Sequence, residues 1–409
     1  MSEHSTPMAT AHVTAPYGPL TDALKTAEFG TLCATAPAQT GVLIEADDTG
    51  LTLRTNDWET AVSITVPTAT VTQAGASLLP LAQLTKAMKA MVAGETKATA
   101  ARTPVTLAGD LLSTDHLTVP IESFPVSEFA PAKKPAPLAA HIDAQDLYRE
   151  LQRVIPAAGT DDTLPVLTGV QVTLTGYTLT LAATDRYRLA VADVPATPHP
   201  DHPATTAEHP LTALIPATVL TRLSKHLKTC TGPVGIAFGT PELTLTVGDT
   251  TLTIQPREGA LPRYSALFPT TVDTSLTLDR ATAQRALKKC TALIAASGWQ
   301  GSPVTLRWDD DGTLTLAPRI GEPDDLARIK GMHLASTTLH GPTPTARELH
   351  TNPAFLKDAL DAFAGANTLT LHLRDPKEGS TNLPPLVLTT GTRPTGDGYR
   401  HLLMPVRAS

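Results

Sequence analysis

Aromatic and charged residues are both scarce in this sequence. Phe, Trp and Tyr make up 4% of the 409 residues and charged side chains 17%, both low for a soluble protein. So few aromatics leave little material for the stacking platforms on which single-strand-binding proteins hold bases. The formal net charge is −7. This acidity argues against a protein whose entire surface grips nucleic acid, but it is compatible with a local basic channel.

Cysteine is rare, and long apolar runs are missing. Cys33, Cys230 and Cys290 lie far apart and form no Cys-x-x-Cys pair, which argues against a disulfide scaffold and a cysteine-based zinc site. The polar N-terminus lacks the apolar segment of a secretory signal. No stretch approaches the roughly 18 apolar residues of a membrane helix. We therefore expect a soluble cytoplasmic protein with no membrane contact, and the length indicates two to four domains.

Helix-type apolar spacing recurs at a long, nearly constant interval. Residues 81–91, 218–227 and 354–363 each show the i, i+3, i+4, i+7 pattern of an amphipathic helix. Their central leucines, Leu84, Leu220 and Leu356, are spaced by 136 residues. A second helix is predicted in each copy, at 20–25, 143–151 and 279–287. The interval indicates three domains rather than a short-period solenoid.

Alternating apolar and polar residues between the helices predict strand hairpins with Gly- or Asp-containing turns. The predicted strand pairs are 42–45 with 51–54, 170–174 with 179–182, and 304–307 with 314–317. We therefore predict an α+β protein with three repeated domains of two helices and about eight strands each. The predicted domains are 1–137, 138–271 and 272–409. Chance similarity among amphipathic helices is the alternative, but it does not explain why helices and hairpins recur in the same order.

Basic residues repeat with the helices. Lys86 and Arg222 are 136 residues apart, as are Arg149 and Arg285. Several of these helical segments contain no carboxylate. Solvated helix faces are the simplest explanation for such residues, whereas a basic lining on an acidic body suits a protein that holds phosphates without reading sequence. The residues predicted to face DNA are Lys86, Lys89, Arg149, Arg153, Arg222, Lys225, Arg285, Lys288 and Lys289.

Two motifs carry a family resemblance. Ala183-Thr-Asp-Arg-Tyr-Arg-Leu-Ala190, with Thr163–Gly169 upstream and Leu403-Met-Pro-Val-Arg407 near the end, resembles the bacterial DNA sliding clamp, the β subunit of DNA polymerase III, in its high-GC bacterial form. The match covers the second and third copies directly and the first only through the repeat. The resemblance implies the DNA-clamp fold and a head-to-tail homodimeric ring.

The resemblance also implies a function. Such a ring is a processivity factor that slides on double-stranded DNA without sequence preference. It is a non-catalytic subunit of the polymerase holoenzyme. The implied partners are the replicative polymerase alpha subunit, the clamp loader and other clamp-motif proteins.

Partner peptides of this family bind in a groove between the second and third domains. Carried over by motif, the residues of that pocket are Leu167, Thr184, Arg186, Tyr187, Arg188, Leu189, Pro262, Leu267, Asn352, Phe355, Pro385, Leu403, Met404, Pro405, Val406 and Arg407. An apolar cleft with an adaptable Met and a few polar anchors suits peptide binding.

The sequence departs from the family at several places. Residues 33–41 replace an Arg-Pro-containing stretch, so one DNA-contacting arginine has no match. The chain ends in Ala408-Ser409 where a Leu commonly follows the Arg, and Ala266 stands where a basic residue is frequent. These differences leave two alternatives open. One is a paralogous clamp, specialised or inhibitor-tolerant, and the other is a protein-binding scaffold that has lost DNA loading.

Catalytic readings have little support. An enzyme would depend on Asp185 with Arg188, but no Gly-rich phosphate loop, His-Glu-x-x-His segment or nucleophile elbow is present. Residues 309–312 are better interpreted as a hairpin turn than as a cation loop. The 195–210 segment contains three histidines that could form a metal site, but its high proline content favours a solvated loop. We therefore expect that the protein is not an enzyme and that it binds no cofactor and no metal.

Overall fold

The computed structural model describes residues 9–130, 136–309, 313–334, 336–341, 348–374, 384–395 and 398–406. The chain divides into two compact units, each considered by itself below. Unit 1 comprises Met1–Ala144, Thr197–Ala204 and Lys225–Pro256, and unit 2 comprises Gln145–Ala196, Thr205–Ser224 and Arg257–Ser409. Among the described residues, no helix is long and apolar enough to cross a membrane.

All six helices predicted from apolar spacing are present. Their bounds are α1 Tyr17–Ala27, α2 Leu81–Met91, α4 Ala144–Val154, α5 Ala217–Leu227, α6 Arg280–Ser297 and α8 Pro353–Ala362. Helix α6 continues well beyond the predicted end at residue 287. It stops at Gly298, whose φ of 78° is the left-handed conformation that commonly ends a helix. Two short helices, α3 Lys97–Ala100 and α7 Pro323–Leu326, were not predicted.

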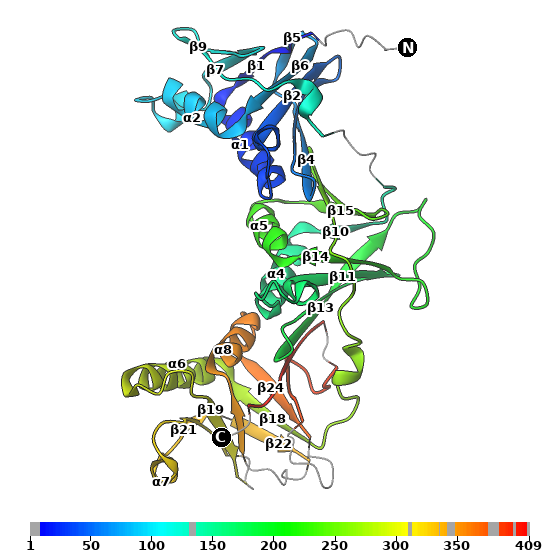
Figure 1. Ribbon diagram of the computed structural model, residues 1–409. Coiled ribbons are helices and arrows are strands. Elements are labelled where there is room, and N and C mark those ends of the chain that lie inside the picture. Colours follow the sequence, from blue (N-terminus) through cyan, green and yellow to red (C-terminus); the bar gives the residue numbers. More distant parts are fainter. Residues whose placement is uncertain are drawn as a thin grey trace. The chain divides into compact units, whose positions relative to one another are not determined.

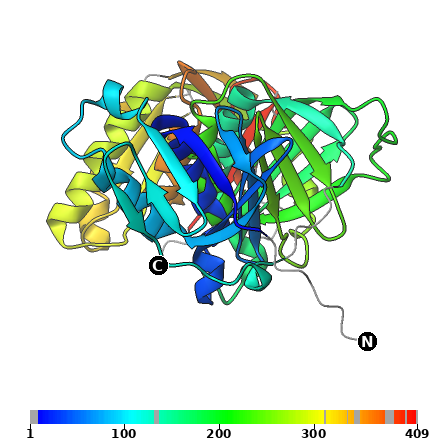
Figure 2. The same ribbon diagram turned by 90° about the horizontal axis from the view of Figure 1, so that it is seen from above.

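Unit 1 contains one long run of antiparallel strands in the order β6-β2-β3-β4-β17-β16-β15-β10. The bounds are β2 Gly41–Asp47, β3 Gly50–Asn56, β4 Thr60–Val66, β6 Gly75–Pro80, β10 Ala140–Asp143, β15 Pro233–Phe238, β16 Leu243–Val247 and β17 Thr250–Ile254. A second run, β5-β1-β7-β8-β9, is formed by β1 His12–Pro16, β5 Thr70–Gln73, β7 Pro104–Ala108, β8 Leu111–Ser113 and β9 Thr118–Pro120. Figure 2 shows the dark blue strand β1 beside its cyan partner β7.

Helices cover one face of the long sheet in unit 1. Strand β4 alternates buried and partly exposed residues, so Val62 and Ile64 point to the face on which α1 packs. Leu20 and Leu24 of α1 are fully buried on that side. In Figure 1, α1 and α2 lie together beside the blue strands. The opposite face of β4 carries the smaller side chains Ala61 and Ser63.

Unit 2 repeats this construction with the strand order β14-β11-β12-β13-β26-β25-β24-β18-β22. The bounds are β11 Gly169–Thr175, β12 Thr178–Thr184, β13 Arg188–Pro198, β14 Leu211–Pro216, β18 Thr274–Asp279, β22 Ser336–His340, β24 Thr368–Leu373, β25 Leu386–Thr389 and β26 Tyr399–Leu403. A smaller sheet, β21-β20-β19-β23, is formed by β19 Val304–Trp308, β20 Leu314–Pro318, β21 Met332–Leu334 and β23 Glu348–Thr351. Helices α6 and α8 pack against each other in this unit (Figure 1).

Two turn predictions meet different outcomes. Strands β19 and β20 pair as a hairpin, and the Asp309 amide donates to the Thr313 carbonyl at 3.0 Å, as a turn requires; residues 310–312 lie outside the described part. The predicted loop at 195–210 begins too early, because β13 continues to Pro198. Pro195 lies opposite Thr178 within the sheet. The amide of the next residue, Ala196, donates to the Tyr177 carbonyl at 2.8 Å.

Candidate functional site

The tight turn between β12 and β13 shapes one side of the predicted groove. The Asp185 carboxylate accepts hydrogen bonds from the amides of Tyr187 and Arg188, each at 3.0 Å. Arg186 has φ of 80°, a left-handed conformation rare outside glycine. The Asp185 bonds hold this strained residue in place. As a result Arg186 and Tyr187 project outward, and Tyr187 is 56% exposed.

Strand pairing brings the C-terminal segment to this turn. Strands β13 and β26 are antiparallel, with Arg188 opposite Leu403. Beyond β26 the Met404 amide donates to the Tyr187 carbonyl at 2.8 Å, and the Val406 amide donates to the His350 carbonyl at 2.8 Å. The two motifs that carry the family resemblance are therefore neighbours in space.

Helix α8 supplies the facing wall. Asn352 caps the helix, since its side-chain oxygen accepts from the Ala354 amide at 2.9 Å. Phe355, in the first turn, stacks on Tyr187 with ring centroids 6.3 Å apart. The Arg188 guanidinium lies 4.5 Å from the Phe355 ring centre, a cation–π distance. Tyr187 and Phe355 thus form a continuous aromatic surface.

The predicted residues differ in how they contribute. Leu189 and Leu403 are buried, at 1% and 0% exposure, so they support the surface from beneath and are not open to a ligand. Leu189 belongs to the core cluster against which Leu167 packs. The more accessible members are Arg186, Tyr187, Pro262, Leu267, Met404 and Val406, while Leu167, Thr184, Arg188, Asn352, Phe355, Pro385 and Pro405 are half-buried. Arg407 lies outside the described residues.

An ion-pair network connects the two walls. Arg188 donates to Asp185 at 2.9 Å and also pairs with Asp358 of α8. The Arg188 side chain is only 11% exposed. In the sequence, Asp358 is an acidic residue 136 positions after the basic Arg222. The structure gives it a role, since it pairs with Arg188, whose guanidinium lies over the Phe355 ring. Asp185 is likewise engaged in this structural network.

A buried pair lies close to these elements. The Tyr399 hydroxyl donates to the Arg153 carbonyl at 3.1 Å and lies 2.8 Å from His401 Nδ1. Burial lowers the pKa of His401 to about 3 and raises the pKa of Tyr399 well above its usual value. Both side chains are therefore neutral at physiological pH, so the pair supports packing and not proton transfer.

The residues predicted to face DNA lie on four helices. Lys86 and Lys89 are exposed on α2, Arg222 and Lys225 on α5, and Arg285, Lys288 and Lys289 on α6. Helix α4 differs. Arg149 pairs with Asp146 at 2.8 Å and Glu150 at 2.9 Å, and Arg153 pairs with Glu150 at 3.0 Å. Helix α4 therefore offers less net positive charge than its arginines indicate.

The described residues provide no group of three or more His, Cys, Asp or Glu that could hold a metal ion. The described cysteines Cys33, Cys230 and Cys290 form no disulfide with one another. Burial raises the pKa of the Cys290 thiol to about 11, so this cysteine is protonated and unreactive near neutral pH.

The chain is similar along its length to solved sliding clamps. The DNA polymerase sliding clamp from Bacillus subtilis matches with a TM-score of 0.79 and 18% identity, covering 98% of this chain and 100% of that one. At this identity the likeness concerns the fold. The protein therefore has the α+β fold of sliding clamps, as predicted.

Sequence comparison establishes the family. The family model "DNA polymerase III beta subunit, central domain" matches residues 141–263. The beta sliding clamp of Streptomyces coelicolor is 28% identical over 394 residues, 91% of this chain and 93% of the relative. That of Micrococcus luteus is 30% identical over 273 residues, 63% of this chain and 80% of the relative. This chain belongs to the beta sliding clamp family, the β subunits of DNA polymerase III, and is not an enzyme.

Proposed function

We propose that this chain is a polymerase processivity factor. Two copies join head to tail in a ring that encircles duplex DNA and slides along it in the cytoplasm. The observation that carries the proposal is the relationship to the Streptomyces coelicolor clamp along 91% of the chain. A closed ring leaves no sheet edge open and stays on DNA by topology, so it needs only a few phosphate contacts.

In this proposal each chain contributes three domains, 1–137, 138–271 and 272–409. The central-domain match at 141–263 supports the middle one. One pair of longer helices falls in each range, namely α1 with α2, α4 with α5, and α6 with α8. The exposed basic residues of α2, α5 and α6 face the DNA, and α4 contributes weakly because its arginines are paired.

The aromatic surface beside the β12–β13 turn is the proposed docking groove for partner peptides. Met404 and Val406 are 37% and 39% exposed, and both are held by backbone hydrogen bonds. Exposed apolar side chains on a rigid backbone lose little entropy when a peptide covers them. The partners are the polymerase alpha subunit, the clamp loader and other proteins with a clamp motif.

The test of ring function is loading onto DNA. A clamp loader with ATP should place the protein on nicked circular DNA, where it stays through gel filtration in 0.15 M salt. Cutting the circle should release it, since a ring slides off a free end. Retention that survives linearisation would contradict a sliding ring. Failure to load, with peptide binding intact, would favour the scaffold alternative.

Truncating Met404 should weaken the groove. Met404→Ala removes an exposed, adaptable side chain next to Tyr187, so a polymerase-derived clamp-motif peptide should bind about tenfold more weakly. Fluorescence anisotropy with labelled peptide measures this. Leu117→Ala, a 50% exposed leucine of unit 1, is the matched control and should bind normally. Equal affinity for Met404→Ala would place the groove elsewhere.

A further inference from the structure

The β3–β4 hairpin of unit 1 reproduces the groove turn of unit 2. The Asp57 carboxylate accepts from the amides of Glu59 at 3.1 Å and Thr60 at 2.7 Å. Trp58 between them has φ of 75°. Asp185 makes the same two bonds, to the residues two and three positions further on, around Arg186 at φ 80°. Trp58 therefore occupies the position of Arg186, and Glu59 that of Tyr187.

The neighbouring strand repeats as well. Thr60 lies opposite Ile254 of β17, as Arg188 lies opposite Leu403 of β26. The next residue, Gln255, donates its amide to the Glu59 carbonyl at 2.7 Å, which matches the bond from Met404 to Tyr187. A proline follows in both segments, at Pro256 and Pro405. Gln255 is thus the counterpart of Met404.

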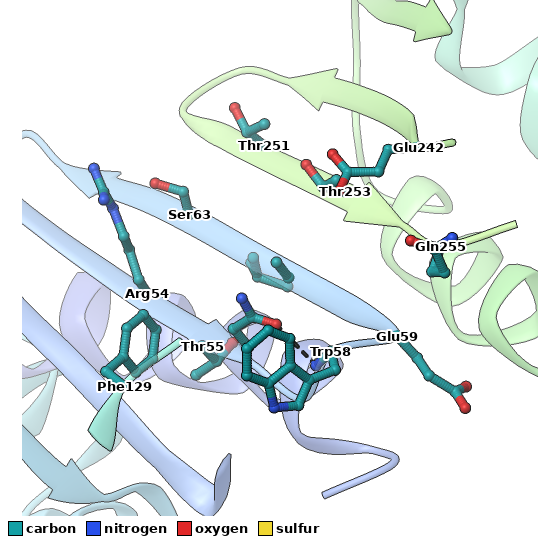
Figure 3. A pocket seen from close by; sticks show the side chains of 13 residues that line it. Arg54, Thr55, Trp58, Glu59, Ser63, Phe129, Glu242, Thr251, Thr253 and Gln255 are labelled. Carbon is teal, nitrogen blue, oxygen red and sulfur yellow. Dashed lines mark hydrogen bonds between the residues drawn. The ribbon is translucent and has the colours of Figure 1, made fainter. Parts of the chain in front are cut away.

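A cavity of about 260 Å³ opens at this second junction, entirely within unit 1. Trp58 and Phe129 line one side, and Thr251 and Thr253 of β17 lie on the sheet that forms its floor (Figure 3). Ligand pockets for whole small molecules hold roughly 300–1,000 Å³. This cavity therefore fits one or two side chains of a bound segment better than a cofactor.

Glu59 places an exposed carboxylate at the cavity, which Glu242 also lines. Arg54 also lines it but forms an ion pair with Glu45 at 3.0 Å, which offsets its charge. A ligand with an apolar group for Trp58 and Phe129 and a positive charge for Glu59 is complementary to these walls.

The Trp58 turn is rigid before any ligand binds. Asp57 is 3% exposed, and its second carboxylate oxygen accepts from the Cys33 amide at 2.7 Å. Cys33 begins the 33–41 stretch in which this sequence departs from the family pattern. Trp58 is 58% exposed in a chain with only three tryptophans. A strained, anchored turn that presents a large aromatic side chain to solvent is typical of a binding site.

We propose that this cavity is a second peptide-binding site, the repeat-related counterpart of the groove in unit 2. Its ligand is a protein segment in which Phe or another large apolar residue is followed by Lys or Arg. The apolar side chain contacts Trp58 and Phe129, and the cation pairs with Glu59. The comparison with the groove rests on the proposed function, but the cavity, its charges and its test do not.

The probe is the hexapeptide acetyl-Gly-Ser-Phe-Lys-Ser-Gly-amide, titrated against full-length protein labelled with 5-fluorotryptophan. The three fluorine resonances report Trp58, Trp299 and Trp308 separately. The Trp58→Phe variant lacks one of them, which identifies the resonance of Trp58. We expect a saturable shift of the Trp58 resonance with the other two unchanged. The same peptide with Glu in place of Lys should bind up to about fivefold more weakly, the effect of one exposed ion pair.

Variants locate the site by anisotropy of the fluorescein-labelled hexapeptide. Trp58→Gly suits the left-handed backbone and should lower affinity at least tenfold, and Glu59→Gln should lower it severalfold. Trp299→Ala, which also removes an exposed tryptophan, and Met404→Ala should leave it unchanged. An unmoved Trp58 resonance, equal binding of the Glu peptide, or normal binding by Trp58→Gly would overturn the proposal. Loss of binding in Met404→Ala would assign the peptide to the groove of unit 2 instead.

Discussion

Reversing two charges on α6, Arg285→Glu with Lys289→Glu, is expected to reduce the amount of protein loaded on nicked circular DNA at least tenfold at 0.15 M salt. The two residues are exposed and one helical turn apart, so they lie on one face. In the proposed dimeric ring the change occurs twice, which removes four cations and adds four anions. Because each phosphate contact adds about 0.9 to the salt slope of binding, the slope should fall by up to about 3.6.

Helix α6 is a better choice for this test than α4, because the arginines of α4 are in ion pairs. Arg149→Glu on α4 would place a third carboxylate beside Asp146 and Glu150, so any loss of loading would mix DNA contact with local instability. Lys330→Glu with Arg393→Glu is the matched control, because both residues are exposed in the same unit but lie outside the predicted set. Sedimentation velocity should show the same oligomeric state for all three proteins. Normal loading of the α6 variant would mean that this face does not meet DNA.

Local patterns in the sequence predict most of the fold. Apolar spacing predicts all six longer helices, and alternation with Gly or Asp turns predicts the hairpins, because both depend on residues close in the chain. The end of α6 is missed because the segment after 287 is rich in alanine and polar residues and depends on Gly298 to stop it. Motif resemblance selects the predicted groove residues but does not separate exposed Met404 from buried Leu403, because that difference depends on strand pairing.

Features that depend on distant pairing escape sequence reasoning. Arg188 and Asp358 are 170 residues apart. The sequence therefore shows Asp358 only as an acidic residue at a position where the repeat has a basic one. The Trp58 cavity forms where β4 pairs with β17, and no local sequence pattern predicts that pairing. The two turns are also not separated by the repeat interval that the sequence indicates. Asp57 and Asp185 differ by 128 residues, close to the 127 between the starts of α1 and α4 but not to the 136 between those of α2 and α5. The segment from the turn to the second helix is longer in the second copy.

Removing Arg188 should cause the largest loss of stability among the groove residues. Its guanidinium is nearly buried, donates to Asp185 at 2.9 Å, pairs with Asp358 and lies over Phe355. Arg188→Ala leaves two carboxylates without their cation, and breaking a buried pair from one side costs about 3–5 kcal/mol. The thermal midpoint should fall by about 10 °C. Arg186→Ala, which truncates an exposed neighbour of the same type, should change it little.

A double-mutant cycle isolates the contact between the two walls. Asp358→Asn alone removes one carboxylate, and in the Arg188→Ala background it should be less harmful or even stabilising, because the repulsion it relieves exists only there. We expect a coupling of about 1–3 kcal/mol between the two substitutions, as for residues in one ion-pair network. The same cycle read by peptide anisotropy should show coupling, since Arg188 and Asp358 position Phe355 against Tyr187. Additive changes in both readouts would mean that the pair does not hold the walls together.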